Sequence, residues 1–194
     1  MVTLDEIKEL RDLTGVSIMQ CQQALVAAGG DKAKALIELK KKSSAIADKK
    51  ADRTLGSGVV GVYSHGGNIG AMVKLLCETD FVANNPEFRE LASDIAMHVA
   101  AMAPEFVSDK MISEPLREEL KSSFLAEVSG MQKPDEVKAK IVEGKLASYF
   151  GERTLLDQPF VKNGDMTVGQ LIKSAIQKFG ENIQVESISR IAVK

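Results

Sequence analysis

The sequence predicts an α+β fold, in which helices pack against an antiparallel sheet. Three observations support this class. The N-terminal region is punctuated by helix caps, an alternating apolar segment is interrupted by Gly66 and Gly67, and later residues show helical periodicity before a closing strand. Helices that are segregated against an antiparallel sheet are typical of α+β domains. We expect a helical head with its linker over residues 1–54 and an α+β core over residues 55–194.

Composition places the chain among ordinary globular proteins. It has 194 residues, of which 44% are hydrophobic and 27% charged, and a net charge of −2. This charge predicts no general affinity for nucleic acid or for an anionic membrane. No apolar run approaches the roughly 20 residues that span a bilayer, and the start resembles neither a signal nor a transit peptide. Cys21 and Cys77 lie among apolar residues, so we expect reduced core thiols in a cytoplasmic protein.

Three short helices are predicted in the first fifty residues. Each begins at a residue whose side chain caps orphan backbone amides, and the first two end at glycine. The caps are Thr3 (with Glu6), Ser17 (with Gln20) and Asp31, and the stops are Gly15 and Gly29–Gly30. A bundle of this size is only marginally stable alone. We therefore expect a docking head with apolar surface left for a partner.

The third helix is expected to continue as a solvated linker. Lys40–Lys42 is followed by a stretch rich in Lys and Ala that reaches Asp52. Lysines at a helix C-terminus complement the helix dipole, which explains most such runs. A nucleic-acid patch is the alternative, but no aromatic residue lies nearby to stack on bases.

A hairpin and the loop after it are the most informative part of the core. From Gly56 the pattern favours two strands around residues 65–68, and the second strand covers residues 69–77. This strand leads directly into residues 78–86, a loop whose position it would fix, and such loops often carry function. Phe81 in this loop has two interpretations: it is an aromatic wedge offered to a partner, or it turns inward and fills the core.

The remaining chain is mainly helical. His98 falls within the first of these helices, and with two histidines in the chain we expect no zinc site. Serine, histidine and acidic residues show no spacing that organises a catalytic site, so we expect neither an enzyme nor a bound cofactor. Periodicity and stop signals predict helices over residues 88–102, 114–127, 134–150 and 167–179, and a strand over residues 183–193.

Two segments resemble the signatures of the elongation factor Ts family. The head segment is Leu10–Gly15, followed by Cys21, Ala24–Leu25 and Gly30–Asp31, and the core segment is Glu78–Ala83 with Asn85. The match continues in order through Asp94–Ala101, Lys140–Leu146 and Leu155–Val161. It covers nearly the whole chain, and the combination is highly specific.

The resemblance implies a translation factor that exchanges guanine nucleotide on elongation factor Tu. Such a factor binds Tu in its GDP-bound and nucleotide-free states, makes or breaks no covalent bond, and needs neither a stable nucleic-acid partner nor a membrane. Its head is similar to a ubiquitin-associated (UBA-like) domain and docks on the nucleotide-binding domain, while its core loop disturbs the Mg²⁺ and phosphate side of the pocket. The implied contacts are Thr79, Asp80, Phe81 and Val82 in the loop, and Leu13, Thr14, Gly15 and Val16 in the head. His98 is a candidate support for the wedge, with packing in the core as the alternative.

The chain resembles the short form of the family, in which two copies pair through their sheets. The strand over residues 183–193 is then a candidate interface of a homodimer, because an unpaired apolar edge invites another strand. Burial of this strand under the chain's own helices is the competing interpretation. Two other functional classes stay open: a protein-binding adaptor that uses the head alone, and an RNA-binding protein that uses Lys40–Lys42.

Overall fold

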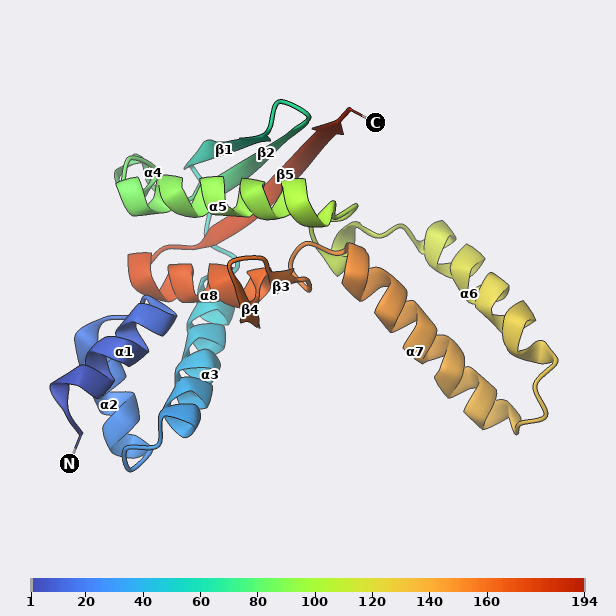
Figure 1. Ribbon diagram of the computed structural model, residues 1–194, viewed down its shortest axis with the longest axis horizontal. Helices are drawn as coiled ribbons and strands as arrows, with labels where there is room; N and C mark the ends of the chain where they lie inside the picture. The colour runs from blue at the N-terminus through green and yellow to red at the C-terminus, as the bar shows by residue number, and fades with distance from the viewer. Residues whose placement is uncertain (1, 194) are drawn as a thin grey trace.

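The computed structural model describes residues 2–193 and confirms the α+β class. Figure 1 shows a helical head, a small sheet covered on one face by a long helix, and a two-helix arm that extends away from both. The elements are α1 (Leu4–Thr14), α2 (Ile18–Ala27), α3 (Lys32–Lys50), β1 (Ser57–His65), β2 (Ile69–Cys77), α4 (Asp80–Ala83), α5 (Pro86–Met102), η1 (Asp109–Met111), α6 (Glu114–Ser129), α7 (Asp135–Arg153), β3 (Pro159–Phe160), β4 (Asn163–Thr167), α8 (Val168–Phe179) and β5 (Ile183–Ala192). Among the described residues, no helix is long and apolar enough to cross a membrane.

The central sheet is antiparallel with strand order β1-β2-β5. Gly66 and Gly67 form the hairpin turn with positive φ angles of 56° and 72°, a conformation that glycine adopts without steric cost. The alternate residues Ala71, Val73 and Leu75 of β2 are buried in the core, as a strand covered on one face requires. β1 and β5 are therefore the two edges of this sheet.

The head has its own small core, built from α1, α2 and the first half of α3. The expected caps are present at Thr3 and Asp31, and Gly15 ends α1 in the left-handed conformation. At Ser17 the predicted capping box is only half formed. The hydroxyl of Ser17 accepts the amide of Gln20, but the Gln20 carboxamide oxygen accepts a hydrogen bond from Gln177 of α8 at 2.9 Å. The head thus gains a direct polar contact with the core.

The second half of α3 differs from the expected solvated linker. Ser43 and Ala47 are buried, because these small residues, one helical turn apart, let α8 approach closely. The Ser43 hydroxyl is hydrogen-bonded to Gln177. Lys40 and Lys50 donate to the backbone carbonyls of Asp165 (3.1 Å) and Gly180 (2.6 Å), so part of the lysine run holds α3 on the core.

The arm consists of α6 and α7, packed on each other as antiparallel neighbours (Figure 1). Both helices appear where the sequence predicts them, within about three residues at each end. At the base of the arm, Phe106, Phe150 and Tyr149 make edge-to-face aromatic contacts, and the Arg117 guanidinium lies 5.1 Å from the centre of the Phe150 ring. The short hairpin of β3 and β4 was not predicted, because its strands are short and show no clear alternation of apolar and polar residues.

The approach of α5 to the sheet depends on Gly61 in β1. A Cβ atom at this position would lie 2.1 Å from the Ala92 carbonyl oxygen of α5, so Gly61→Ala must push the helix backbone away. We expect a loss of about 1–3 kcal/mol or more in the free energy of unfolding. Gly70→Ala is the matched control, since nothing lies within 4 Å of its Cβ position. Urea unfolding checks this, and equal effects of both substitutions would contradict the close packing.

Candidate functional site

The Phe81 side chain points into solvent and is 82% exposed. It lies on the single helical turn α4, whose residues Val82 and Ala83 face the core and are buried. Because these two residues fill the inward face of the turn, the ring of Phe81 is directed outward, and the inward interpretation is wrong. Thr79 and Asp80 are also exposed, with Thr79 as the N-cap of α4. The predicted loop thus offers an acidic and an aromatic side chain together.

A carboxylate from a distant part of the chain holds the start of this loop. Glu181, in the turn between α8 and β5, accepts hydrogen bonds from the backbone amides of Glu78 and Thr79, both at 3.0 Å. Its other oxygen accepts the Thr79 hydroxyl at 2.6 Å. Hydrogen bonds to an ionised acceptor are stronger than neutral ones. Three of them converge on one side chain here.

The neighbouring carboxylate, Glu78, makes the reverse connection. It accepts the backbone amide of Asn182 at 2.6 Å and pairs with Arg53 at 3.4 Å. The Asn182 amide, and next to it the Arg53 guanidinium, hold the pKa of the Glu78 carboxyl below its usual value. The Asn182 side chain in turn donates to the carbonyls of Ala51 and Arg53, which directly follow α3. The turns at residues 77–79 and 180–182 are therefore cross-linked by two carboxylates.

The far end of α4 is held by polar contacts as well. Arg89 of α5 donates to the Ala83 carbonyl at 3.3 Å and to the Asn84 side chain at 2.7 Å. Asn85 caps α5 by accepting the amide of Glu87 at 2.9 Å. Below the loop, the Cys77 thiol donates to the Thr79 carbonyl at 3.2 Å, and burial raises its pKa, which keeps it protonated. Cys77 and Cys21 are both free and buried, as predicted.

Of the four head residues, Leu13 and Gly15 are exposed, Thr14 is half-buried and Val16 is buried. The Thr14 hydroxyl donates to the Leu10 carbonyl at 2.7 Å. Val16, with 1% of its surface exposed, belongs to the core of the head, just as Val82 belongs to the main core. These two valines are therefore packed in the two cores and expose almost no side-chain surface.

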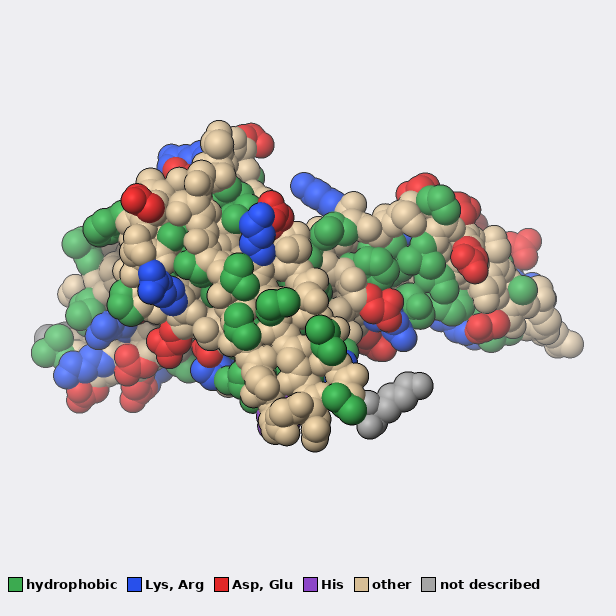
Figure 2. Space-filling view, turned by 90° about the horizontal axis from the view of Figure 1, so that it is seen from above, with side chains coloured by type: hydrophobic (Ala, Val, Ile, Leu, Met, Phe, Trp, Pro, Cys, Tyr) green, Lys and Arg blue, Asp and Glu red, His purple; other side chains and the backbone are tan. Residues whose placement is uncertain are grey.

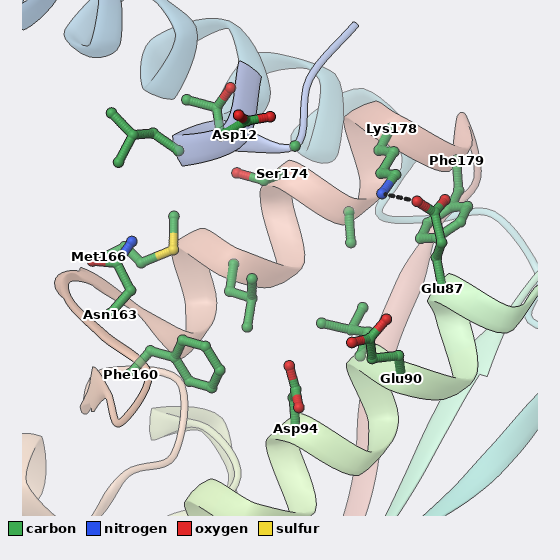
Figure 3. A pocket seen from close by; sticks show the side chains of 16 residues that line it. Asp12, Glu87, Glu90, Asp94, Phe160, Asn163, Met166, Ser174, Lys178 and Phe179 are labelled. Atoms are coloured by element: carbon green, nitrogen blue, oxygen red, sulfur yellow. Dashed lines mark ion pairs between the residues drawn. The ribbon is translucent and has the colours of Figure 1, made fainter. Parts of the chain in front are cut away.

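Leu13, Thr14 and Gly15 border a cavity of about 290 Å³ between the head and the core. Figure 3 shows its apolar side, with Phe160 and Met166, and its acidic side, with Glu87, Glu90 and Asp94 from α5. The Lys178 ammonium pairs with Glu87 at 3.0 Å across its edge.

The head segment and the Phe81 loop meet at the start of α5. Pro86, its first residue, shares a surface hollow with Asp80 and Phe81. The next residue, Glu87, borders a polar recess beside Gly15 of the head. Figure 1 shows the head and α4 at the same end of the molecule, opposite the arm. A single partner can therefore contact both.

His98 is placed in the core, away from the loop. It lies about twelve residues beyond the start of α5, roughly 18 Å along the helix axis. Its Nε2–H donates to the Gln158 carboxamide oxygen at 2.9 Å, and its Nδ1 accepts the Val161 amide at 3.2 Å. The side chain is fully buried and joins α5 to the segment before β4. Its surroundings favour the core role over support of Phe81.

The structure also reveals functional candidates that the sequence did not. Glu181 and Asn182 bind loop residues that lie 102 to 104 positions away along the chain, and Arg89 binds loop residues five and six positions before it. The only sequence signal is the pair Glu181-Asn182 between a helix stop at Gly180 and a strand. Within residues 2–193 no group of three or more potential ligands could hold a metal ion.

Comparison with known proteins assigns the chain to a family. A family model described as Elongation factor TS matches residues 45–194. Elongation factor Ts of Thermodesulfovibrio yellowstonii is 44% identical over 192 residues, which cover 99% of this chain and 96% of the relative. The proteins of the same name from Solibacter usitatus and Geobacter metallireducens are 42% and 40% identical over 193 residues, covering 99% of this chain and 91% and 89% of the relatives. The similarity extends over head and core alike.

The burial of His98 predicts a dependence of stability on pH. Burial lowers the pKa of the imidazole, against a smaller opposing effect of its hydrogen bond to Gln158. The unfolded chain takes up a proton near the ordinary pKa of about 6.5, while the folded protein does so only at lower pH. The free energy of unfolding should therefore fall as the pH drops below about 6.5, and His98→Gln should remove this part of the slope. Urea unfolding at several pH values checks this, with the exposed His65→Gln as control, and an unchanged slope in His98→Gln would contradict it.

Proposed function

The chain belongs to the elongation factor Ts family of translation elongation factors, and we propose that it is the guanine-nucleotide exchange factor of elongation factor Tu. The observation that carries this proposal is Phe81, an aromatic side chain that is 82% exposed on a braced turn. A large apolar ring with this exposure makes few contacts within the folded monomer. Its placement instead suits insertion into a partner.

The proposed action is on the Mg²⁺ and phosphate side of the nucleotide pocket. GTPases of this kind hold the phosphates with backbone amides, a lysine and a bridging Mg²⁺, so a small displacement there weakens nucleotide binding. The ring of Phe81 is rigid and has few rotatable bonds, so little conformational entropy opposes its insertion. The exposed carboxylate of Asp80 lies next to it in the chain and would rearrange hydrogen bonds near the metal. No covalent bond changes, so the factor is not an enzyme in the bond-making sense.

The head would supply a second, independent attachment to Tu. Exposed apolar side chains cluster on α1 and α2, among them Leu13 (57%), Ile18 (50%) and Met19 (67%). This matches the apolar surface that a docking head needs. Contact at the head and insertion of Phe81 then occur on the same end of the molecule, which lets the head hold Tu while the loop acts.

Thermodynamic coupling sets the size of the effect required. A factor that loosens nucleotide must itself be loosened by nucleotide to the same extent. A change of ~100-fold in GDP affinity corresponds to about 2.7 kcal/mol, which a few contacts can supply. The factor speeds exchange in the cytoplasm, and the cellular excess of GTP over GDP sets its direction.

We also propose that two copies pair through the sheet. The face of the sheet away from α5 carries exposed apolar residues, namely Val60, Val62, Met72 and Ile191. Figure 2, which views this side, shows apolar side chains over the sheet and along the arm. Most of β5 is exposed, so the chain's own helices do not bury this strand. A monomer in sedimentation equilibrium at micromolar concentration would contradict this pairing.

Release of a fluorescent GDP from Tu, followed by stopped flow, tests the exchange function. The wild-type protein should accelerate release strongly, and Phe81→Ala should remove most of the acceleration, because truncating an anchoring aromatic costs at least about 2 kcal/mol, or roughly 30-fold. Met111→Ala, which truncates another exposed apolar side chain (56%) away from the site, should have no effect.

Complex formation with nucleotide-free Tu is measured alongside by gel filtration and should persist in Phe81→Ala. If Phe81→Ala accelerates GDP release as strongly as the wild type, the exchange function is supported but the role of the Phe81 ring as a wedge is wrong. If the folded wild-type protein does not accelerate GDP release, the proposed exchange function is wrong and the protein-binding adaptor becomes the favoured function.

A further inference from the structure

We propose that Glu181 is a positioning residue for exchange, which fixes the direction of Phe81 without touching Tu or its nucleotide. This inference rests on the exchange function proposed above. Its structural basis is the set of three hydrogen bonds through which one carboxylate holds Glu78 and Thr79. The residues joined in this way are 102 and 103 positions apart in the chain.

The turn that carries Phe81 cannot hold itself. An isolated helical turn is unfavourable, because several backbone angles must be fixed for each hydrogen bond that forms. α4 has four residues, and its conformation must therefore come from its surroundings. Val82 and Ala83 anchor its inner side, and Arg89 holds its C-terminal end. At its N-terminal end, Glu181 alone accepts the backbone amides of Glu78 and Thr79.

Removal of the Glu181 carboxylate would release that end. The two amides and the Thr79 hydroxyl would lose their shared acceptor, and water would replace it at this partly exposed position. The turn would then sample several orientations, while the buried residues beneath it stay packed. Phe81 would remain present but would spend less time in the direction required for insertion.

The location of Glu181 suits such a role better than a purely structural one. Its side chain lies outside the buried core, in the turn between α8 and β5. The next residue, Asn182, is buried and ties this turn to the carbonyls of Ala51 and Arg53. The turn therefore keeps its place when the Glu181 side chain is changed. The carboxylate therefore determines mainly the position of the loop that it binds.

Kinetics of GDP release from Tu give the first test. Glu181→Ala should lower the maximal release rate at saturating factor roughly tenfold or more, since small misplacements of a positioned group cost up to about 100-fold. The concentration at half-maximal rate should stay within about twofold, because the head is untouched. Glu181→Gln should recover much of the rate, since its amide oxygen can accept both backbone amides while its NH₂ group donates to the Thr79 hydroxyl. Glu118→Ala on the arm is the matched control and should behave as the wild type.

Fluorescence anisotropy gives a second test that needs no partner. The sequence contains no tryptophan, so Phe81→Trp introduces a single indole at the tip of the loop. Time-resolved anisotropy should show restricted motion of this indole, and Glu181→Ala in the same background should increase the amplitude of its nanosecond motion. Thr79→Val keeps the side-chain shape but removes both the hydrogen bond to Glu181 and the cap that the hydroxyl makes to the Val82 amide, so it should also increase the amplitude.

The two tests separate the outcomes. Slow release by Glu181→Ala together with a mobile indole supports the positioning role. Release within twofold of the wild type, or an indole whose motion is unchanged by Glu181→Ala and Thr79→Val, overturns it. If the wild type does not accelerate release at all, the exchange function fails, and the anisotropy still decides whether Glu181 fixes the loop. Urea unfolding verifies that each variant is folded.

Discussion

The site depends on one carboxylate, Glu181, which accepts the backbone amides of Glu78 and Thr79, the two residues that lead into the turn carrying Phe81. An isolated helical turn is unfavourable. Val82, Ala83 and Arg89 hold the inner side and the C-terminal end of α4, and Glu181 holds the segment that enters it. With the Glu181 contact, and with Glu78 bound in return to the Asn182 amide, two turns about a hundred residues apart form one unit. An exposed aromatic side chain can then be rigid, which insertion into a partner requires.

The rest of the fold brings a second surface to the same end. α3 runs from the core of the head onto α8, where its small residues Ser43 and Ala47 permit close packing. The head is thereby fixed against the core instead of hanging on a flexible linker. Its segment at Leu13–Gly15 faces the start of α5, where the Phe81 loop also ends. In the proposed exchange function, the head would bind Tu and the loop would act on its nucleotide pocket, with both held in one frame.

The sequence predicted the parts of the structure that local chemistry controls. Caps and glycines located the head helices, alternation located the hairpin, and the family resemblance singled out the loop at Phe81. Contacts between distant segments could not be predicted from the sequence, because neither periodicity nor spacing relates Glu181 to Thr79, or His98 to Gln158. The burial of Ser43 was missed for the same reason, since a polar residue in a lysine-rich stretch is buried only because α8 covers it. The orientation of the Phe81 side chain could not be predicted from the sequence either, because an aromatic residue after a strand can pack in a core or point to the surface.

A double-mutant cycle tests most directly whether Glu181 acts through Phe81. The maximal rate of GDP release from Tu is measured for the wild type, Glu181→Ala, Phe81→Ala and the variant with both substitutions. If the carboxylate works only by directing the ring, the double variant should release GDP at the rate of Phe81→Ala alone. Losses that multiply across the two positions would show that they act independently, and would contradict this account of the site.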